Sequence, residues 1–355
     1  MKAVLIGAGE ESCRIIKKAQ ELGISVTAVD SKTDARGMKL ADEQLVLDIT
    51  DEVAVWEAME EIKPDFVLHD TTPQAMLAAG AANEELGLKG ISRVAAVYCA
   101  DKNKMMKRLA EKKLGDLISD KVYAGVEYGA DGVMDGAAFN LVFLRKKITS
   151  SSAGETAGYI SVPEVTTAQQ KLRDMVEGYL TQAATVLGLK NCLIHADLVI
   201  ARSKIYTMGI SVSIAGNSIY DVFIPAASGV DMTEQYLRSR IGAPYSYQPV
   251  KTAQMVIRYF DLHAGIVSRV PEREMVEWFC REKCGGIALE MWVCHVRVGD
   301  ELEKNASEQT VMERGYFILS GGSEEMLLVA AEGIGMFFRV DPVEEEEADP
   351  ETENM

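Results

Sequence analysis

Short apolar runs alternate with amphipathic stretches along the first ninety or so residues. Residues 1–9 form an apolar run that ends in glycines, and residues 10–22 repeat isoleucine, alanine and leucine at helical spacing. Further strands are predicted at 25–30, 43–47 and 64–69, and further helices at 51–62 and 71–86. Strands that alternate with helices through short connections indicate a parallel sheet covered on both faces. We therefore predict an α/β, Rossmann-like N-terminal sheet.

The glycine turn after the first predicted strand is a candidate ligand site. Ligands of open parallel sheets lie beyond the carboxyl ends of the strands, so Gly7 and Gly9 are candidate substrate-binding positions. A dinucleotide fingerprint would need a third glycine near Cys13, and Glu10 and Glu11 place negative charge where a pyrophosphate would approach. We expect a tight strand-to-helix turn here and no bound NAD.

Three polar residues end other strands of the same predicted sheet. Asp30 resembles the acid that binds the ribose of a dinucleotide. His69 and Asp70 follow the strand at 64–69, where they could line a substrate pocket or cap the next helix. The sequence favours neither alternative.

The second half of the chain changes to a period of two. From Leu193 to Val199 every second residue shares a face, so His195 and Asp197 lie on a polar face opposite an apolar one. A turn at 202–204 and a second run at 205–214 complete an antiparallel hairpin. Other strands are predicted at 139–148, 254–260, 265–269, 287–298 and 315–319, and helices at 171–187, 232–241, 272–281 and 323–337. We therefore expect an α+β region with an antiparallel sheet.

Charge and composition narrow the class of protein. The chain has 355 residues and a net charge of −17, which argues against nucleic acid or an anionic membrane as a partner. Residues 342–355 are acidic and nearly devoid of apolar side chains, so we expect a disordered tail. No secretory signal precedes the first strand, no long apolar run occurs, and the six scattered cysteines favour buried free thiols. We expect a cytoplasmic protein.

Three motifs resemble the ATP-grasp superfamily of carboxylate-amine and carboxylate-thiol ligases, which also contains biotin carboxylase and carbamoyl-phosphate synthase. They are the helix start at Asp101-Lys102, the strand with Gly125-Val126-Glu127, and the segment Glu313-Arg314-Gly315. The resemblance implies a Rossmann-like domain at 1–100, a reduced ATP-grasp domain with a C-terminal subdomain at 101–341, and the tail. It also implies that Lys102 and Glu127 bind nucleotide, with Lys102 on a phosphate.

The chain departs from the family pattern in two places. Only residues 116–118 separate the Lys102 helix from the segment at 119–128, so most of the central ATP-binding subdomain is missing. Asp197 matches the first metal-binding carboxylate, but Gly209, Ser211 and Ser213 stand where the family has glutamate, asparagine and arginine. We therefore expect a degenerate member of the superfamily.

Two functions remain open. In the first, a non-catalytic homodimer, or a heteromer with a complete homologue, binds a small anionic or amino-acid-like ligand through Lys102, His195 and Arg314. In the alternative, an active ligase uses ATP and Mg²⁺, with Asp197 on the metal, and passes through an acyl phosphate. In that case the run at 145–147, Arg-Lys-Lys, would replace the lost cations, although a solvated strand end is the simpler interpretation.

Overall fold

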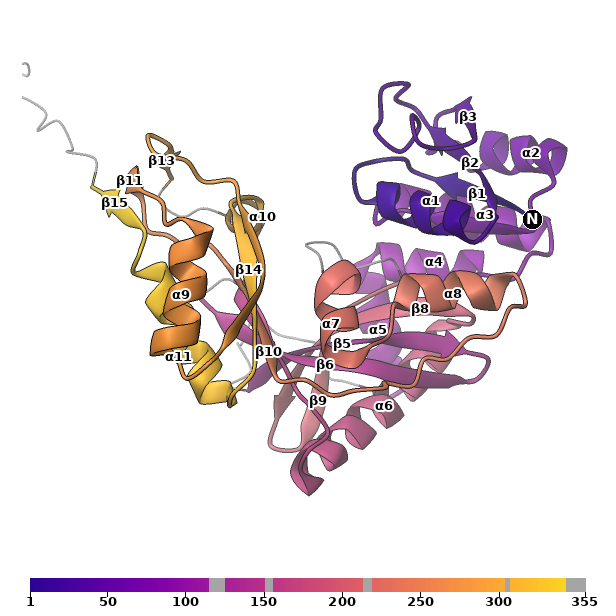
Figure 1. Cartoon of the computed structure of the whole chain (residues 1–355). Helices are drawn as coiled ribbons and strands as arrows, with labels where there is room; N and C mark the ends of the chain where they lie inside the picture. The colour runs from indigo at the N-terminus through magenta and orange to yellow at the C-terminus, as the bar shows by residue number, and fades with distance from the viewer. Residues whose placement is uncertain (115–124, 151–155, 213–218, 304–306, 343–355) are drawn as a thin grey trace, which may run out of the picture. The chain divides into compact units, whose positions relative to one another are not determined.

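The computed structural model describes residues 1–114, 125–150, 156–212, 219–303 and 307–342 (Figure 1). Two compact units are present: unit 1 comprises residues 1–146 and 161–253, and unit 2 comprises residues 147–160 and 254–355. The boundaries predicted from the motifs, after residues 100 and 341, stay a prediction. The segment at 116–118, Ser213 and the tail from residue 343 lie outside the described residues.

Unit 1 begins with the predicted parallel sheet. Its strands are β1 (Lys2–Ile6), β2 (Ser25–Asp30), β3 (Glu43–Val46) and β4 (Phe66–His69), in the order β3-β2-β1-β4. All the pairings are parallel. Val4 and Ile6 of β1 pack in one apolar cluster, whereas Ala3 and Leu5 pack in another, so both faces of the sheet are buried as the pattern predicts.

Five helices accompany this sheet in sequence. They are α1 (Ser12–Glu21), α2 (Glu52–Ile62), α3 (Pro73–Glu85), α4 (Arg93–Ala100) and α5 (Lys102–Glu111). The sequence did not predict α4, because its valine, tyrosine and cysteine residues are poor helix formers. Tertiary packing and a cap stabilise it: Ala95 and Ala96 are fully buried, and the Ser92 hydroxyl accepts a hydrogen bond from the Ala95 amide.

An antiparallel sheet forms the rest of unit 1. Its strands run in the order β6-β5-β8-β9, with bounds β5 (Val126–Asp135), β6 (Ala138–Thr149), β8 (Cys192–Ala201) and β9 (Lys204–Ser211). Helix α6 (Thr167–Leu187) packs Val176 and Leu180 in one cluster with Ile194, Ala196 and Leu198 of β8. This face of the sheet is therefore apolar and covered, and the alternation predicted for residues 193–199 is confirmed.

Three short helices follow β9 in unit 1. They are the π-helix η1 (Ile219–Phe223), α7 (Ile224–Ser228) and α8 (Met232–Arg240). Of these the sequence predicted α8, as the helix at 232–241. Figure 1 shows α7 on the opposite side of the sheet from α6.

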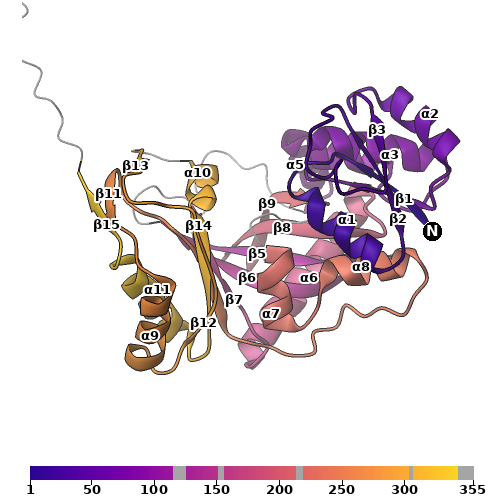
Figure 2. The ribbon, with the colours of Figure 1, turned by 45° about the horizontal axis from the view of Figure 1, so that its top comes forward.

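Unit 2 contains a second antiparallel arrangement (Figure 2). Four strands run in the order β12-β14-β10-β7, with bounds β7 (Thr156–Ser161), β10 (Met255–Tyr259), β12 (Ala288–Cys294) and β14 (Gly315–Ser320). A small sheet has the order β13-β11-β15, with bounds β11 (Gly265–Arg269), β13 (Glu301–Leu302) and β15 (Arg339–Asp341). The helices of unit 2 are α9 (Arg273–Lys283), α10 (Glu308–Glu313) and α11 (Glu324–Gly335).

Aromatic side chains build much of the core of unit 2. Phe260 lies 5.1 Å from Trp292 and 5.0 Å from Phe338 between ring centroids. The strand predicted at 287–298 is shorter than expected and ends at Cys294, where its partner β14 begins at Gly315. The sequence missed β13, β15 and α10 because elements this short carry little periodic signal.

The described residues contain free cysteines and no helix suited to a membrane. All six cysteines are free thiols, and Cys13, Cys192 and Cys280 are buried, as predicted for small core residues. No helix among the described residues is long and apolar enough to cross a membrane.

A glycine at the bulge between β5 and β6 provides a test of this packing. A Cβ atom at Gly132 would lie 2.2 Å from the Asn140 carbonyl oxygen and 2.6 Å from the Phe139 ring. We expect Gly132→Ala to lower the free energy of unfolding by about 1–3 kcal/mol through overpacking. Thermal unfolding of the full chain measures the change.

Gly178 provides the matched control. It lies exposed in α6, and a Cβ atom there would meet nothing within 4 Å. Gly178→Ala should therefore stabilise the chain by about 0.5–1 kcal/mol, because alanine favours the helix. A melting temperature for Gly132→Ala equal to that of the wild type would contradict the described packing of β5 on β6.

Candidate functional site

The second face of the β6-β5-β8-β9 sheet carries charged side chains. Arg145 of β6, Asp131 of β5, and His195 and Asp197 of β8 share this face, since residues two apart on a strand point the same way. The strand register places Gly129 between Arg145 and Asp197. The apolar face packs against α6, so the charged side chains lie on the face that does not contact this helix.

Asp131, Arg145 and His195 form a compact charged group. His195 Nδ1 is 2.7 Å from Asp131 Oδ1, and Arg145 Nη2 is 2.9 Å from the same ring nitrogen. Arg145 Nε lies 3.4 Å from Asp131 Oδ2, and both of these side chains are fully buried. A buried carboxylate is tolerated only when it is paired, and Arg145 supplies the opposite charge.

A line of polar groups leads from this buried pair to the surface. The His195 side chain is 19% exposed and the Asp197 side chain 53%, and His195 Nε2 lies 3.8 Å from Asp197 Oδ1. A proton placed on Nδ1 would be donated to Asp131, and Nε2 would then accept a hydrogen bond from Arg145 Nη2, which lies 3.2 Å away. Asp131 thus fixes the orientation of the imidazole, and Asp197 is the carboxylate of the group that an incoming ligand can reach.

Glycine makes room for the buried arginine. A Cβ atom at Gly129 would lie 1.5 Å from Arg145 Nη1, within the guanidinium itself. Across the sheet, Gly209 of β9 is opposite Asp197, and a Cβ atom there would meet nothing within 4 Å. Space beside Asp197 is therefore open, whereas space beside Arg145 is filled.

Aromatic residues from η1 cover the Asp131 end of the group. Phe223 packs edge-on against Phe143 of β6, with ring centroids 5.3 Å apart. Tyr220 is fully buried, and its hydroxyl donates to the Ile194 carbonyl at 3.4 Å. Burial first, and then the negative charge of Asp131, raise the pKa of Tyr220 well above its ordinary value. This cover keeps water from the Asp131–Arg145 pair.

The donors on this face decide whether a metal ion can bind there. Among the described residues no group of three or more His, Cys, Asp or Glu side chains could hold a metal. Asp131 is already paired with Arg145 and His195, so Asp197 is the accessible carboxylate of the group, and Gly209 opposite it adds no ligand. These residues do not fit a free Mg²⁺ ion, because magnesium needs further oxygen ligands such as those of substrate phosphates.

The predicted nucleotide and substrate residues fall in different places. Glu127 of β5 is partly exposed. It shares the polar face with Asp131, which lies four residues later on the same strand. Lys102 is exposed in the first turn of α5. Arg314 directly precedes β14 and belongs to unit 2. The structure therefore brings Glu127, His195 and Asp197 to one face of a sheet, and places Lys102 and Arg314 on other elements.

Two residues of the charged group were missed or misjudged from sequence. Asp131 was not singled out, although it continues the spacing of Glu127 and Gly129 along the strand. Arg145 was expected most simply as a solvated strand end, and this expectation is wrong because its side chain is fully buried. A run of cations at 145–147 conceals which one points inward, since alternate residues of a strand face opposite ways.

The carboxyl ends of the parallel strands are occupied by internal hydrogen bonds. Gly7 has φ +82°, and a Cβ atom there would lie 2.1 Å from Asp70 Oδ2. Asp70 Oδ1 accepts from the amide and the hydroxyl of Thr72, the residue that caps α3. Of the two alternatives for Asp70, the helix cap is provided by Thr72, which Asp70 holds in place, and the substrate-pocket role stays a prediction. Gly9 is exposed with open space beside it.

Asp30 binds backbone amides of its own domain. Its carboxylate accepts from the Ala8 amide and the Lys32 amide, both at 2.8 Å. Asp30 therefore closes the turn after β1, and its interpretation as a ribose ligand stays a prediction. Glu10 pairs with Arg36 at 2.7 Å.

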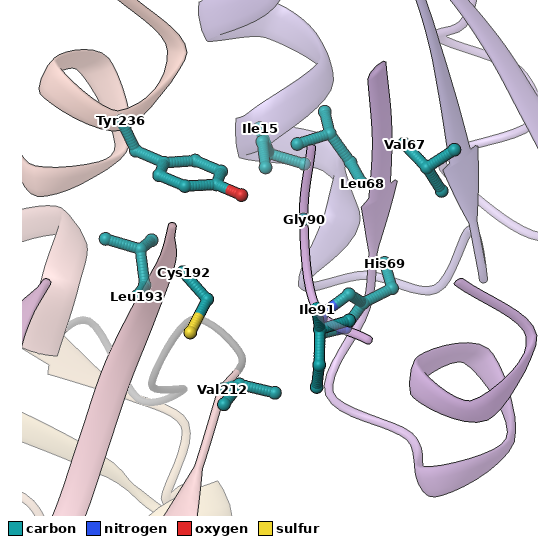
Figure 3. A pocket seen from close by; sticks show the side chains of 10 residues that line it. All are labelled: Ile15, Val67, Leu68, His69, Gly90, Ile91, Cys192, Leu193, Val212 and Tyr236. Atoms are coloured by element: carbon teal, nitrogen blue, oxygen red, sulfur yellow. The ribbon is translucent and has the colours of Figure 1, made fainter. Parts of the chain in front are cut away.

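Small hollows surround His69 in unit 1. Figure 3 shows one in which Tyr236, Cys192 and Leu193 face Ile15 and Leu68, with His69 nearby. Its volume is about 30 Å³, room for a single water molecule. Another, of about 10 Å³, lies beside Ser12, His69 and Asp70. Burial lowers the pKa of His69. These hollows are too small for a substrate, and the binding roles of Gly7 and Gly9 stay predictions.

Comparison with known proteins gave partial sequence matches. No protein-family model matches the chain. A formate-dependent phosphoribosylglycinamide formyltransferase of Janthinobacterium sp. (strain Marseille) is 35% identical over 118 residues, which is 32% of this chain and 28% of the relative. The protein of the same name from Methanocaldococcus jannaschii is 30% identical over 118 residues, 32% of this chain and 29% of its own. The chain thus matches less than a third of the length of these relatives.

Similarity of structure extends over nearly the whole chain. A phosphoribosylglycinamide synthetase from Anaerococcus prevotii superposes with a TM-score of 0.69 at 15% identity, covering 96% of this chain and 99% of that one. An L-amino acid ligase from Bacillus licheniformis gives a TM-score of 0.73 at 14% identity, covering 96% and 98%. These comparisons do not support the predicted degeneracy. With its parallel four-stranded sheet, its antiparallel sheet of charged and apolar faces, and these structural neighbours, the chain has the fold of the ATP-grasp superfamily.

Proposed function

We propose that the chain is an ATP-dependent ligase that joins a carboxylate to an amine or a thiol. The observation that carries the proposal is the charged group of Asp131, Arg145 and His195 leading to exposed Asp197, on the polar face of a ligase-type sheet. The names of the sequence relatives and of the structural neighbours support an active enzyme over a non-catalytic scaffold. ATP and Mg²⁺ are the cofactors that this proposal requires, and the cytoplasm is its expected location.

The reaction has two steps. A carboxylate oxygen of the substrate bonds to the γ-phosphorus as the bond to the bridging oxygen breaks and ADP leaves. The amine nitrogen or thiol sulfur then bonds to the acyl carbon of this acyl phosphate, phosphate leaves, and a proton is released to solvent. Catalysis of such steps rests on positioning and on neutralising charge.

The chain's own side chains divide these tasks. Asp197 is exposed beside the open space at Gly209, where phosphates with their metal could approach it. His195 is held by Asp131 and Arg145, and its partly exposed ring borders the same place as a substrate contact. Lys102 would contact a nucleotide phosphate and Glu127 the nucleotide, as the family resemblance implies. Among the described residues, Asp197 would hold the metal only together with oxygen ligands from phosphates.

A specific observation favours a second candidate function, a ligand-binding or regulatory subunit without turnover. Gly209 and Ser211 of β9 lie opposite Asp197 and His195 of β8 and carry no charge. Loss of one preorganised charge-stabilising group raises a reaction barrier by roughly 3–4 kcal/mol. Such a subunit would act as a homodimer or beside a complete homologue, and it would bind its small ligand without releasing ADP.

Mg-ATP binding separates the two candidates. For the ligase we expect the melting temperature to rise with Mg-ATP, since ligand at a hundred times its dissociation constant stabilises a fold by about 2.7 kcal/mol. Asp197→Asn should remove the magnesium dependence, and Lys102→Ala should weaken binding about tenfold. Lys107→Ala, another exposed lysine of α5, is the matched control and should bind as the wild type does.

Release of ADP during turnover completes the test of the two candidate functions. With the twenty common L-amino acids supplied together as carboxylate and amine donors, release of ADP above the rate without them supports the ligase. Binding of Mg-ATP with no acceptor-dependent ADP would support the second candidate, and absence of any thermal shift at saturating Mg-ATP would exclude the ligase.

The open space at Gly209 allows a gain-of-function prediction. Gly209→Glu would add a second carboxylate opposite Asp197 without a clash, because a Cβ atom there meets nothing within 4 Å. We expect Mg-ATP to bind about tenfold more tightly, or about 1.4 kcal/mol, in calorimetric titrations. Gly209→Ala controls for the loss of glycine and should leave affinity unchanged. Equal affinities for all three proteins would show that nucleotide does not bind at this face.

A further inference from the structure

Unit 2 contains a hollow of its own, separate in its residues from the polar face of unit 1. Its volume is about 470 Å³, within the range of small-molecule sites. Segments around β12, β13, α10 and the start of β14 form it. The lining residues are His295, Val296, Asp300, Glu301, Leu302, Glu303, Thr310, Glu313 and Arg314. This volume has room for a free amino acid or a short peptide.

Arg314 is the buried cation of this hollow. The residue is 7% exposed, and its backbone is fixed by hydrogen bonds with the His295 amide at 3.0 Å and the Val311 carbonyl at 3.3 Å. Within the described part of the chain its guanidinium makes one hydrogen bond, from Nη1 to the Leu262 carbonyl at 3.1 Å. A guanidinium has five N–H donors, and the charges of Asp261 and Glu303 also act on this one. This geometry suits a carboxylate, which accepts two parallel hydrogen bonds from arginine.

Negative charge dominates the rest of the lining. Asp300, Glu301, Glu303 and Glu313 are all exposed carboxylates. Asp300 Oδ2 accepts from the Arg297 amide at 2.8 Å, which holds its loop in place. A rim of four acids around one arginine repels polyanions such as a nucleoside triphosphate, and it attracts an ammonium group.

We propose that this hollow binds a zwitterion: a free α-amino acid or a short peptide with its amino terminus free. The carboxylate of the ligand would pair with Arg314, and its ammonium group would face the acidic rim. A simple anion would leave the rim unbalanced, and a metal ion or polyamine would be repelled by Arg314. A zwitterion uses both charges of the site, and its binding requires no nucleotide.

The test uses the full chain without nucleotide and each of the twenty common L-amino acids, by saturation-transfer NMR and then calorimetry. At least one amino acid should bind with a dissociation constant of millimolar or tighter. For that amino acid, the amine that lacks the carboxylate and the acid that lacks the amine should each bind at least tenfold more weakly. Failure of every amino acid to bind at 10 mM would overturn the proposal.

Variants locate the binding site. Arg314→Gln should weaken binding at least tenfold. Arg314→Lys keeps the charge and should retain part of the affinity, so it serves as the test if Arg314→Gln folds poorly. Glu301→Gln with Glu303→Gln should weaken the amino acid several-fold and leave the amine-free acid unchanged or tighter. Glu274→Gln, an exposed acid on α9, is the control and should change nothing.

Two outcomes would assign the hollow to another ligand. Equal affinity for the amino acid and its amine-free acid would indicate a simple anion site, and binding of Mg²⁺ or spermidine that Arg314→Gln leaves intact would indicate a cation site. Because none of these measurements contains ATP, they are independent of the Mg-ATP thermal shift, so failure of one proposal is distinguishable from failure of the other.

Discussion

The buried ion pair between Asp131 and Arg145 is the constraint on which the polar face of unit 1 depends. Both side chains are fully buried, and His195 completes the pair with a hydrogen bond to the carboxylate. Breaking such a pair by removing one partner costs about 3–5 kcal/mol, because the remaining charge stays buried. Strands β5, β6 and β8 must therefore keep their register, and Gly129 is needed where the guanidinium lies.

The same sheet links folding to function through its two faces. On one face, Ile194, Ala196 and Leu198 pack with α6, and this apolar contact holds the sheet in place. On the other, Asp131 orients His195, and the chain of polar groups ends at exposed Asp197. The buried residues of the sheet thus fix the position of exposed Asp197, which is the general arrangement of a preorganised site. The open space beside Gly209 adds the room that a phosphate would need.

Much of the fold was predictable because its signals are local. The apolar runs and the glycine turn predicted β1 to β4, and the alternation from Leu193 to Val199 placed His195 and Asp197 on one face. The partners of those residues come from β5 and β6, far away in the sequence, so the ion pair could not be foreseen. Arg145 stands in a run of cations, which looks solvated until the neighbouring strand is known. Arg314 was expected to contact a ligand together with Lys102 and His195, yet its surroundings in unit 2 depend on β13 and α10, elements too short to predict.

Nucleotide binding at the face that carries His195 and Asp197 can be observed directly. The chain has four histidines, so the imidazole signals of the ¹⁵N-labelled protein can be assigned with a His195→Gln variant. Titration with Mg-ATP should move the His195 signals and leave those of His263, in unit 2, unchanged. Saturation with Mg-ATP that leaves the His195 signals in place would contradict the account.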